Sequence, residues 1–150
     1  MKKFITLITV LAVVLAASGQ VNVAPKSNEG KLNEEYCSGV FRTSPGTILD
    51  VAGSQSAMGY VNIMDWIEGR VAGLKIQTTR YGQKIPLVRG DEVAIFVDEI
   101  PVSAAYLSTV PVSDIAIVKV IRTPFPGSMN NTPAIAVYRM KVSEEAEEEK

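Results

Sequence analysis

The chain has 150 residues, with 15 basic and 16 acidic side chains, no histidine and one cysteine. This near-neutral balance excludes the strongly basic surface of a typical nucleic-acid-binding protein. Without histidine, Ser-His-Asp and Cys-His catalysis are excluded and the commonest zinc ligand is missing. Because Cys37 is alone, an internal disulfide is excluded, and we interpret it as a small buried or tolerated thiol rather than a reactive or intermolecular one.

Residues 1–19 have the pattern of a secretory signal peptide. Two lysines precede an apolar run that closes on small residues in "MKKFITLITVLAVVLAASG". The run is too short to favour a spanning helix, and no later segment is apolar for long enough to cross a bilayer. We therefore expect an exported protein whose mature chain has no transmembrane span; a retained N-terminal anchor is the alternative.

Residues 20–56 mix Pro, Gly, Ser, Asn and charged residues without a sustained period. This composition predicts a mostly irregular leader, in which only "TILDVAG" at 47–53 suggests a short strand or a helical turn. At the other end, residues 143–150 hold five glutamates and one lysine, a pattern typical of an acidic disordered tail. The organised domain is expected between them, at residues 57–142.

This domain begins with the segment "NIMDWIEGRVAGLKI", residues 62–76. Asn62 is suited to cap a helix, and Asp65 lies in its first turn, where a carboxylate is favourable. Gly73 is placed to end this helix in a left-handed conformation, and "LKIQ" then alternates as a half-buried strand does. The buried stripe of the helix is expected to consist of Met64, Ile67 and Val71.

Two extended segments follow. "IPLVRG" at 85–90 is a short strand candidate, and "VAIFVDEIPVS" at 93–103 predicts two strands joined by a tight reversal at Asp98 and Glu99. Pro101 assigns the second of these strands to a sheet edge, because proline cannot donate to a ladder.

The last part of the domain predicts a brief helix and two further strands. Pro111 fits the first turn of the helix, and "IAIVKVI" at 115–121 is β-branched enough for a buried strand. A loop at 123–133 leads to a final strand at 134–141. The fold class is therefore α+β: a small mixed sheet of about four strands with two or three short flanking helices.

The order of these segments resembles the plug domain of TonB-dependent outer-membrane receptors. The resemblance covers about 80 residues and implies a plug-like fold, which normally sits inside a transmembrane barrel. It assigns structural roles rather than catalytic ones to the matching positions. These are Gly69 and Gly73 in the helix-to-strand segment, Arg89 and Gly90 in "PLVRG", Asp98 and Pro101 in the hairpin, and Asp114 before the buried strand.

Three departures from the family pattern are visible. Glu99 stands where the family has glycine, so a turn that requires positive φ would be strained there. Pro133 lies near the start of the last strand. The sequence stops at Lys150, where a receptor would continue into barrel strands, so we expect a small stand-alone plug-like protein without the barrel.

Few residues point to chemistry. The carboxylate pairs at 91–92 and 98–99 are expected to be solvated turn residues rather than an acid–base or calcium site. Trp66 is expected to pack in the core rather than stack on a ligand. The variable loop "TTRYGQK", with Arg80, Tyr81 and Lys84, and the loop "TPFPGSMNN" are the expected surface for a ligand or partner.

These observations favour a non-enzymatic binding domain that needs no cofactor or metal. The leading hypothesis is an accessory to TonB-dependent uptake, in the periplasm or at the periplasmic face of the outer membrane. Its partner would be an envelope protein such as a barrel receptor or an energy-transducing protein. The alternatives are a periplasmic module that binds a glycan, peptide or chelate, and a truncated receptor relic.

Overall fold

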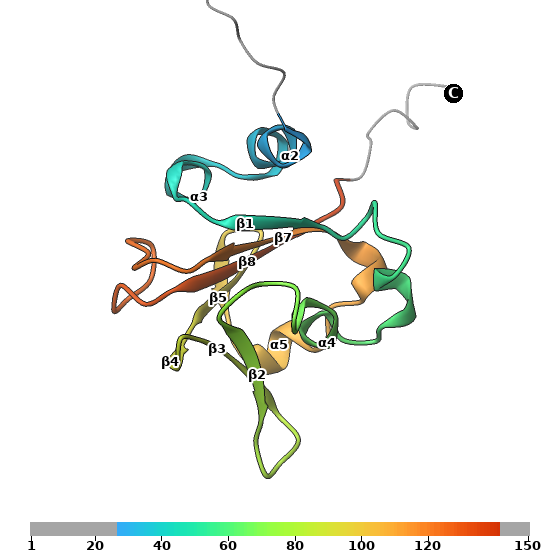
Figure 1. Ribbon diagram of the computed structural model, residues 1–150, viewed down its shortest axis with the longest axis vertical. Helices are drawn as coiled ribbons and strands as arrows, with labels where there is room; N and C mark the ends of the chain where they lie inside the picture. Colours follow the sequence, from blue (N-terminus) through green and yellow to red (C-terminus); the bar gives the residue numbers. More distant parts are fainter. Residues whose placement is uncertain (1–26, 142–150) are drawn as a thin grey trace, which may run out of the picture.

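The computed structural model describes residues 27–141, which form two sheets and several short helices (Figure 1). A five-stranded mixed sheet has the order β1-β7-β8-β5-β6, and a three-stranded antiparallel sheet has the order β2-β3-β4. The α+β class is confirmed, with more strands than the four expected.

The strands are β1 (Thr47–Asp50), β2 (Leu74–Thr78), β3 (Lys84–Val88), β4 (Asp91–Glu92), β5 (Ala94–Val97), β6 (Ile100–Val102), β7 (Ile115–Ile121) and β8 (Ala134–Arg139). The helices are α2 (Asn28–Tyr36), α3 (Gly39–Thr43), α4 (Ile63–Ile67) and α5 (Ala104–Leu107), with 3-10 turns η1 (Ala57–Gly59) and η2 (Val112–Asp114).

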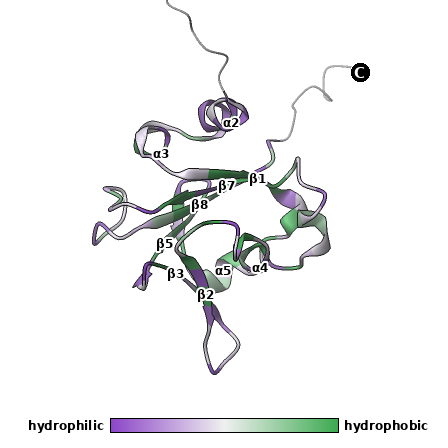
Figure 2. Ribbon diagram, viewed as in Figure 1, coloured by the Kyte–Doolittle hydropathy of each residue, from purple (hydrophilic) through white to green (hydrophobic). Residues whose placement is uncertain are grey.

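β7 and β8 are neighbours in the interior of the five-stranded sheet, and hydrophobic residues predominate in β7 (Figure 2). Every residue of β7 is buried, as its β-branched sequence predicts. β8 pairs antiparallel with β7 and parallel with β5. A register shift at Ala116 interrupts the β7–β8 ladder, and the Ala116 carbonyl instead accepts bonds from the backbone N–H groups of Val51 and Ala52, both at 3.0 Å.

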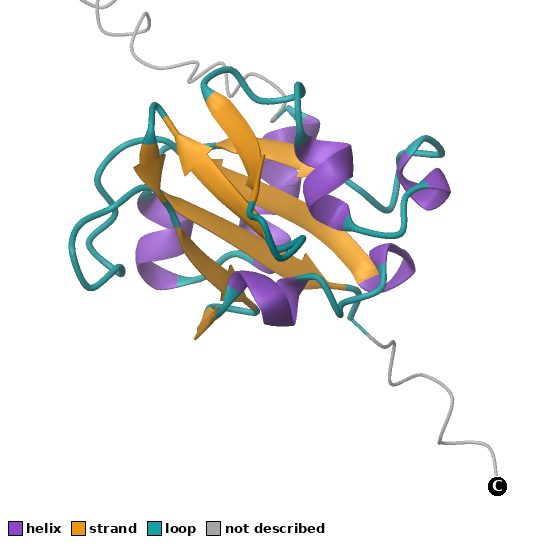
Figure 3. Cartoon of the chain, turned by 90° about the horizontal axis from the view of Figure 1, so that it is seen from below, coloured by secondary structure: helices purple, strands orange, loops and turns teal. Residues whose placement is uncertain are grey.

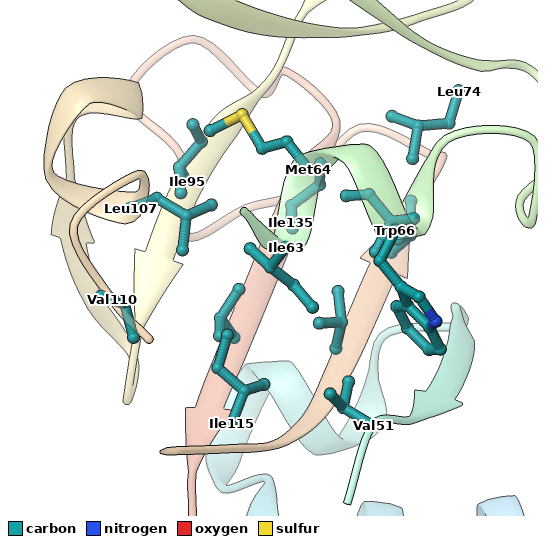
Figure 4. Packing of buried hydrophobic residues seen from close by; sticks show 14 of the residues in the cluster. Val51, Ile63, Met64, Trp66, Leu74, Ile95, Leu107, Val110, Ile115 and Ile135 are labelled. Carbon is teal, nitrogen blue, oxygen red and sulfur yellow. The ribbon is translucent and has the colours of Figure 1, made fainter. Parts of the chain in front are cut away.

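Helices cover both faces of the five-stranded sheet, so the sheet separates two cores (Figures 1 and 3). The larger core lies on the side of α4 and α5 (Figure 4). There Trp66 is 3% exposed, and its indole N–H donates to Ser56 Oγ at 3.2 Å. Its predicted packing role is confirmed.

The smaller core lies beneath residues 28–43, which comprise α2 and α3 and are called the cap below. Three aromatic rings form its centre, because Phe41 of the cap lies 5.0 Å from the ring of Phe96 and 4.7 Å from that of Phe125. Cys37 is 1% exposed and unpaired, which confirms its interpretation as a buried free thiol.

The expectation of an irregular segment at 20–56 was wrong for its described part. The cap forms two helices, and residues 47–50 form the edge strand β1, so the 47–53 segment contributes a strand. α2 has no buried residue, so its sequence lacks the hydrophobic periodicity from which a helix is predicted. Its stability comes from an N-cap at Ser27, whose Oγ accepts from Gly30 N at 3.2 Å, and from contacts with the sheet. The predicted signal peptide and acidic tail lie outside the described residues.

The predicted cap of the helix at 62 is confirmed, because Asn62 Oδ1 accepts from Met64 N at 2.9 Å. The predicted end at Gly73 was wrong: α4 ends at Ile67, Glu68 is extended, and Gly69 takes a positive φ of 76°. Gly73, with φ of 83°, instead lies in the turn that enters β2. Residues 70–72, between the two glycines, are not helical, and Val71 is buried as predicted.

The hairpin β5–β6 is confirmed, with Pro101 on the edge strand. Pro111 precedes the 3-10 turn η2 as its N-cap residue rather than lying inside a helix. α5 was not predicted individually; Ser103 caps it by accepting from Tyr106 N at 3.1 Å. Across residues 27–141, each helix falls short of the length and apolar character that a bilayer crossing requires.

Candidate binding surface

Two tight turns set the geometry of the exposed loops. Val88 pairs with Asp91 and Val97 pairs with Ile100, so each hairpin has a two-residue turn. All four turn residues have positive φ, the requirement of a type I′ turn, whose twist matches that of the strands. The φ values are 56° at Arg89, 97° at Gly90, 49° at Asp98 and 69° at Glu99.

Asp98 connects the β5–β6 turn to the end of β8. Its carboxylate accepts from the backbone N–H of Arg139 at 3.0 Å and from Arg139 Nε at 2.5 Å. The same hydrogen bond raises the pKa of Arg139 above its ordinary value. The expectation of a solvated pair at 98–99 was therefore wrong, because both carboxylates make specific bonds, whereas Asp91 and Glu92 are exposed. Within residues 27–141 no cluster of acidic, cysteine or histidine side chains is arranged to hold a metal.

Glu99 keeps the positive φ of the turn despite its side chain. Its carboxylate accepts the backbone N–H of Ser38 at 2.6 Å, the hydroxyl of Ser38, and the hydroxyl of Tyr138 at 3.1 Å. Burial is the main cause that raises the pKa of Tyr138 above its ordinary value, so this hydroxyl stays a donor. The glutamate thus attaches the turn to the cap, a role that a glycine could not perform.

The predicted partner loop lies at the tip of the β2–β3 hairpin, which projects from the body (Figure 1). Arg80 is exposed and Tyr81 is 97% exposed. Lys84 differs from them because it forms an ion pair with Asp65 at the start of α4. The structure therefore presents Arg80 and Tyr81 at the tip, whereas Lys84, the first residue of β3 after the loop, is held by Asp65.

A groove of 540 Å³ brings the two predicted loops together. Gln83 contributes from the hairpin loop, and residues 127–130 contribute from the other loop. Arg80, Tyr81 and Lys84 do not line it. β3, β5 and β6 provide an apolar floor that includes Ile95 and Val102. The alternation of apolar and polar residues could not predict this groove, because alternation does not show which strands become neighbours.

A second hollow, of 470 Å³, contains two arginines from distant parts of the chain. Arg122, at the end of β7, donates from Nη1 to Ala72 O at 3.4 Å. Arg89 lies over the next residue, with its Cγ 3.8 Å from the point where a Cβ on Gly73 would stand. Asp91 and Glu92 also line this hollow. Sequence reasoning singled out Arg89 but missed Arg122, because only the fold brings both to the 72–73 turn.

Neither arginine is neutralised by an ion pair within the described part of the chain. The two pairs found there join Asp65 to Lys84 and Asp98 to Arg139. The guanidinium groups of Arg89 and Arg122 are therefore available to a carboxylate from outside the chain.

The remaining family-motif position, Asp114, ends η2 and is exposed. Its backbone carbonyl accepts from Met140 N at 2.8 Å, which fixes the chain after β8. Its side chain accepts from the neighbouring Ser113 at 3.1 Å. Asp114 thus has a structural role through the hydrogen bond that its backbone carbonyl accepts.

Comparisons with known proteins agree at the level of fold. No protein-family model matches the sequence, and no curated protein does. The structure is similar to the RagAB peptide importer in its closed-closed state, with a TM-score of 0.51, 17% identity, and coverage of 68% of this chain and 13% of that chain. It is also similar to a mutant of the ferric enterobactin receptor PfeA from Pseudomonas aeruginosa, with a TM-score of 0.53, 16% identity, and coverage of 79% and 19%.

The fold is that of a TonB-dependent receptor plug domain. This confirms the family resemblance stated from the sequence. The chain spans less than a fifth of the length of either receptor chain. The similarity therefore concerns the plug alone, which in the receptors sits within a barrel.

Proposed function

We propose that this protein is a non-enzymatic, plug-type interaction domain that is exported and serves as an accessory to TonB-dependent uptake. Its partner is an envelope protein, either an outer-membrane barrel receptor or an energy-transducing protein. The similarity of its fold to plug domains of two uptake receptors supports this proposal. The site of action would be the periplasm or the periplasmic face of the outer membrane.

The observation that carries the proposal is the pair formed by Arg89 and Arg122. Both line one hollow beside the 72–73 turn, and neither has a carboxylate partner among the described residues. Arginine forms bidentate bonds with carboxylates and is enriched where protein interfaces have their strongest contacts. A partner that presents an acidic side chain to this hollow would gain a charge-assisted contact.

Cross-linking in intact cell envelopes tests this proposal. The tagged full-length chain is cross-linked, and captured proteins are identified by mass spectrometry against an untagged control. We expect repeated recovery of one barrel receptor or energy-transducing protein. Arg89→Glu should reduce this recovery strongly, whereas Lys31→Glu, the same charge change on the exposed side of α2, should leave it unchanged. Equal recovery with both variants would contradict docking through the arginine pair.

The 540 Å³ groove favours a second candidate function, binding of a small ligand such as a glycan, peptide or iron chelate. Its volume lies within the range of about 300–1,000 Å³ typical of small-molecule sites. A bound ligand should raise the melting temperature in a thermal-shift screen. Met129→Asp, at an exposed groove residue, should weaken that shift, whereas Met58→Asp, at an exposed position outside the groove, should not.

The hairpin tip is a further contact in either case. We infer that Arg80 and Tyr81 contact the partner or ligand, while Lys84 supports the hairpin through Asp65. Arg80→Ala with Tyr81→Ala should weaken binding without lowering stability, since neither side chain is packed. Lys84→Met should lower stability slightly, by up to about 1 kcal/mol, as expected for a partly exposed ion pair.

A further inference from the structure

A lysine lies fully buried on the cap side of β7, the strand between β1 and β8. Lys119 is 1% exposed, and its Nζ donates to Asn33 Oδ1 at 2.7 Å and to the carbonyl of Phe41 at 2.5 Å. The orientation of the Asn33 amide is consistent, because its Nδ2 donates to Arg42 O at 3.0 Å. Both acceptors of the lysine are neutral groups of the cap.

The charge of Lys119 is therefore not balanced by a carboxylate in the described structure. An ammonium group carries three N–H donors, of which two have protein acceptors here. Its burial penalises the charged form and lowers the pKa of Lys119 from its ordinary value. A buried cation is stable when it is paired and hydrogen-bonded, so an anion at the third donor would relieve this penalty.

Lys119 also lines a hollow of 260 Å³ between the start of α2 and the link from α3 to β1. Gly46 keeps this hollow open toward the lysine. A Cβ at Gly46 would stand 3.2 Å from Lys119 Cε and 2.8 Å from the carbonyl of Val120. The missing side chain thus leaves the lysine stem in contact with the hollow.

The size and the lining of the hollow indicate the kind of ligand. Its volume is below the range of about 300–1,000 Å³ found for drug-sized ligands, so it suits a small ion. Its lining includes the hydroxyls of Ser27 and Ser44 and the amide of Asn33, which can donate to an oxyanion. Thr43 also lines it, but its hydroxyl donates to the carbonyls of Gly39 and Val40. Glu29 also lines it, and the side chain of Glu29 opposes an anion at the rim.

We propose that this hollow binds a small monocarboxylate, such as formate or acetate, with Lys119 as its principal donor. The site is independent of the partner proposed above, because it lies on the cap and not at the arginine pair. A bound carboxylate joins β7 to the cap and so fastens the cap to the sheet.

Nuclear magnetic resonance of the full ¹⁵N-labelled chain tests this site. Sodium acetate and sodium formate are titrated at constant ionic strength, with sodium chloride as the balancing salt. We expect saturable shifts of the backbone N–H of Gly30 and Gly46 and of the side-chain amide of Asn33. Shifts that are non-saturating and spread over the surface would overturn the proposal, whether or not any variant folds.

Three variants test whether Lys119 is the group that binds acetate. Lys119→Gln keeps a donor and removes the charge, so acetate should bind about tenfold more weakly. Lys75→Gln removes the same charge from an exposed position on β2 and should bind acetate as the unmodified protein does. Glu29→Gln removes the opposing charge and should bind more tightly. Equal affinity in Lys119→Gln and Lys75→Gln would reject Lys119 as the donor.

Discussion

The hydroxyl of Tyr138, on the central strand β8, donates a hydrogen bond of 3.1 Å to Glu99 in the β5–β6 turn. Glu99 also accepts two bonds from Ser38 of the cap. One carboxylate thus connects a turn, the middle of the sheet and the cap. The side chain that introduces strain into the turn also makes the bonds that hold the surrounding elements.

These bonds predict the effect of replacing Glu99 by glycine, the residue that the family has at this position. Glu99→Gly would relieve about 1 kcal/mol of strain at positive φ but would lose three bonds to a charged acceptor, worth more in sum. We expect a net loss of about 1–2 kcal/mol in the free energy of unfolding, measured by urea denaturation with Trp66 fluorescence. Glu99→Gln keeps one acceptor oxygen, so its free energy of unfolding should lie between those of the original protein and Glu99→Gly. A glycine variant as stable as the original would show that the bonds contribute little.

The aromatic centre of the cap predicts a larger effect. Phe41→Ala removes contacts with two rings at 5.0 and 4.7 Å and leaves a cavity under the cap. Such a change costs about 3–5 kcal/mol in a well-packed core. Val40→Ala, at a neighbouring residue that is 38% exposed, should cost less than about 1 kcal/mol. Comparable urea midpoints for both variants would mean that the cap is only loosely packed.

The buried thiol predicts a pH dependence. Burial is the main cause that raises the pKa of Cys37, whereas an unfolded thiol ionises near about pH 8.5. Above that pH the unfolded state binds fewer protons than the folded state, so stability falls as pH rises toward the folded pKa. The loss is at most about 1.4 kcal/mol per pH unit for this group.

The measurement is a series of urea denaturations from about pH 8 to about pH 10, comparing the protein with Cys37→Ala. The variant should lose less stability over this range. The raised pKa of Tyr36 acts in the same direction in both proteins. Burial keeps the pKa of Tyr138 raised and that of Lys119 lowered in both, but Cys37 also contributes to each of these pKa values, so part of its influence on the slope acts through them. Parallel slopes for the two proteins would argue against an influence of Cys37.

The edge strand β6 predicts a change in association. Ala94 and Asp98 donate their backbone N–H groups to carbonyls at β8, so Phe96, which lies between them, also directs its backbone toward β8. Its antiparallel partner Pro101 must therefore turn its nitrogen toward the free edge, where it offers no donor.

Pro101→Thr would supply that donor and a residue with high β-propensity. We expect concentration-dependent dimers in size-exclusion chromatography with light scattering. Ile100→Thr, next to it on the same strand, should stay at the oligomeric state of the original protein. An unchanged elution for Pro101→Thr would indicate that something other than the proline protects this edge.

Strong local signals explain which elements were predictable. The β-branched run at 115–121 and the alternating segment at 93–103 each have a pattern that few other structures satisfy. Asn62 was recognisable because a cap depends on one residue and its two or three neighbours. The family resemblance added the order of these elements, which local patterns could not supply.

The missed features depend on contacts between distant segments. α2 is mostly polar and has only Leu32 and Tyr36 packed against the smaller core. Its place is also set by Lys119 and by Lys141, which donates to Glu35 O at 2.5 Å. Arg122 acquires its neighbour Arg89 only when β7 ends beside the 72–73 turn. The division into two sheets was also hidden, because alternation reveals an exposed face and not the partner strand.

The position of β8 at the centre of the sheet also bears on the order of folding. β1 pairs only with β7, and β5 meets its parallel partner only when β8 is present, so the sheet consists largely of contacts between segments remote in sequence. Chains with such high contact order fold slowly, since loop closure precedes any gain from packing. During synthesis the cap is complete before β7, β8 and Phe125 exist, so its apolar residues Cys37 and Phe41 stay uncovered until these later segments arrive.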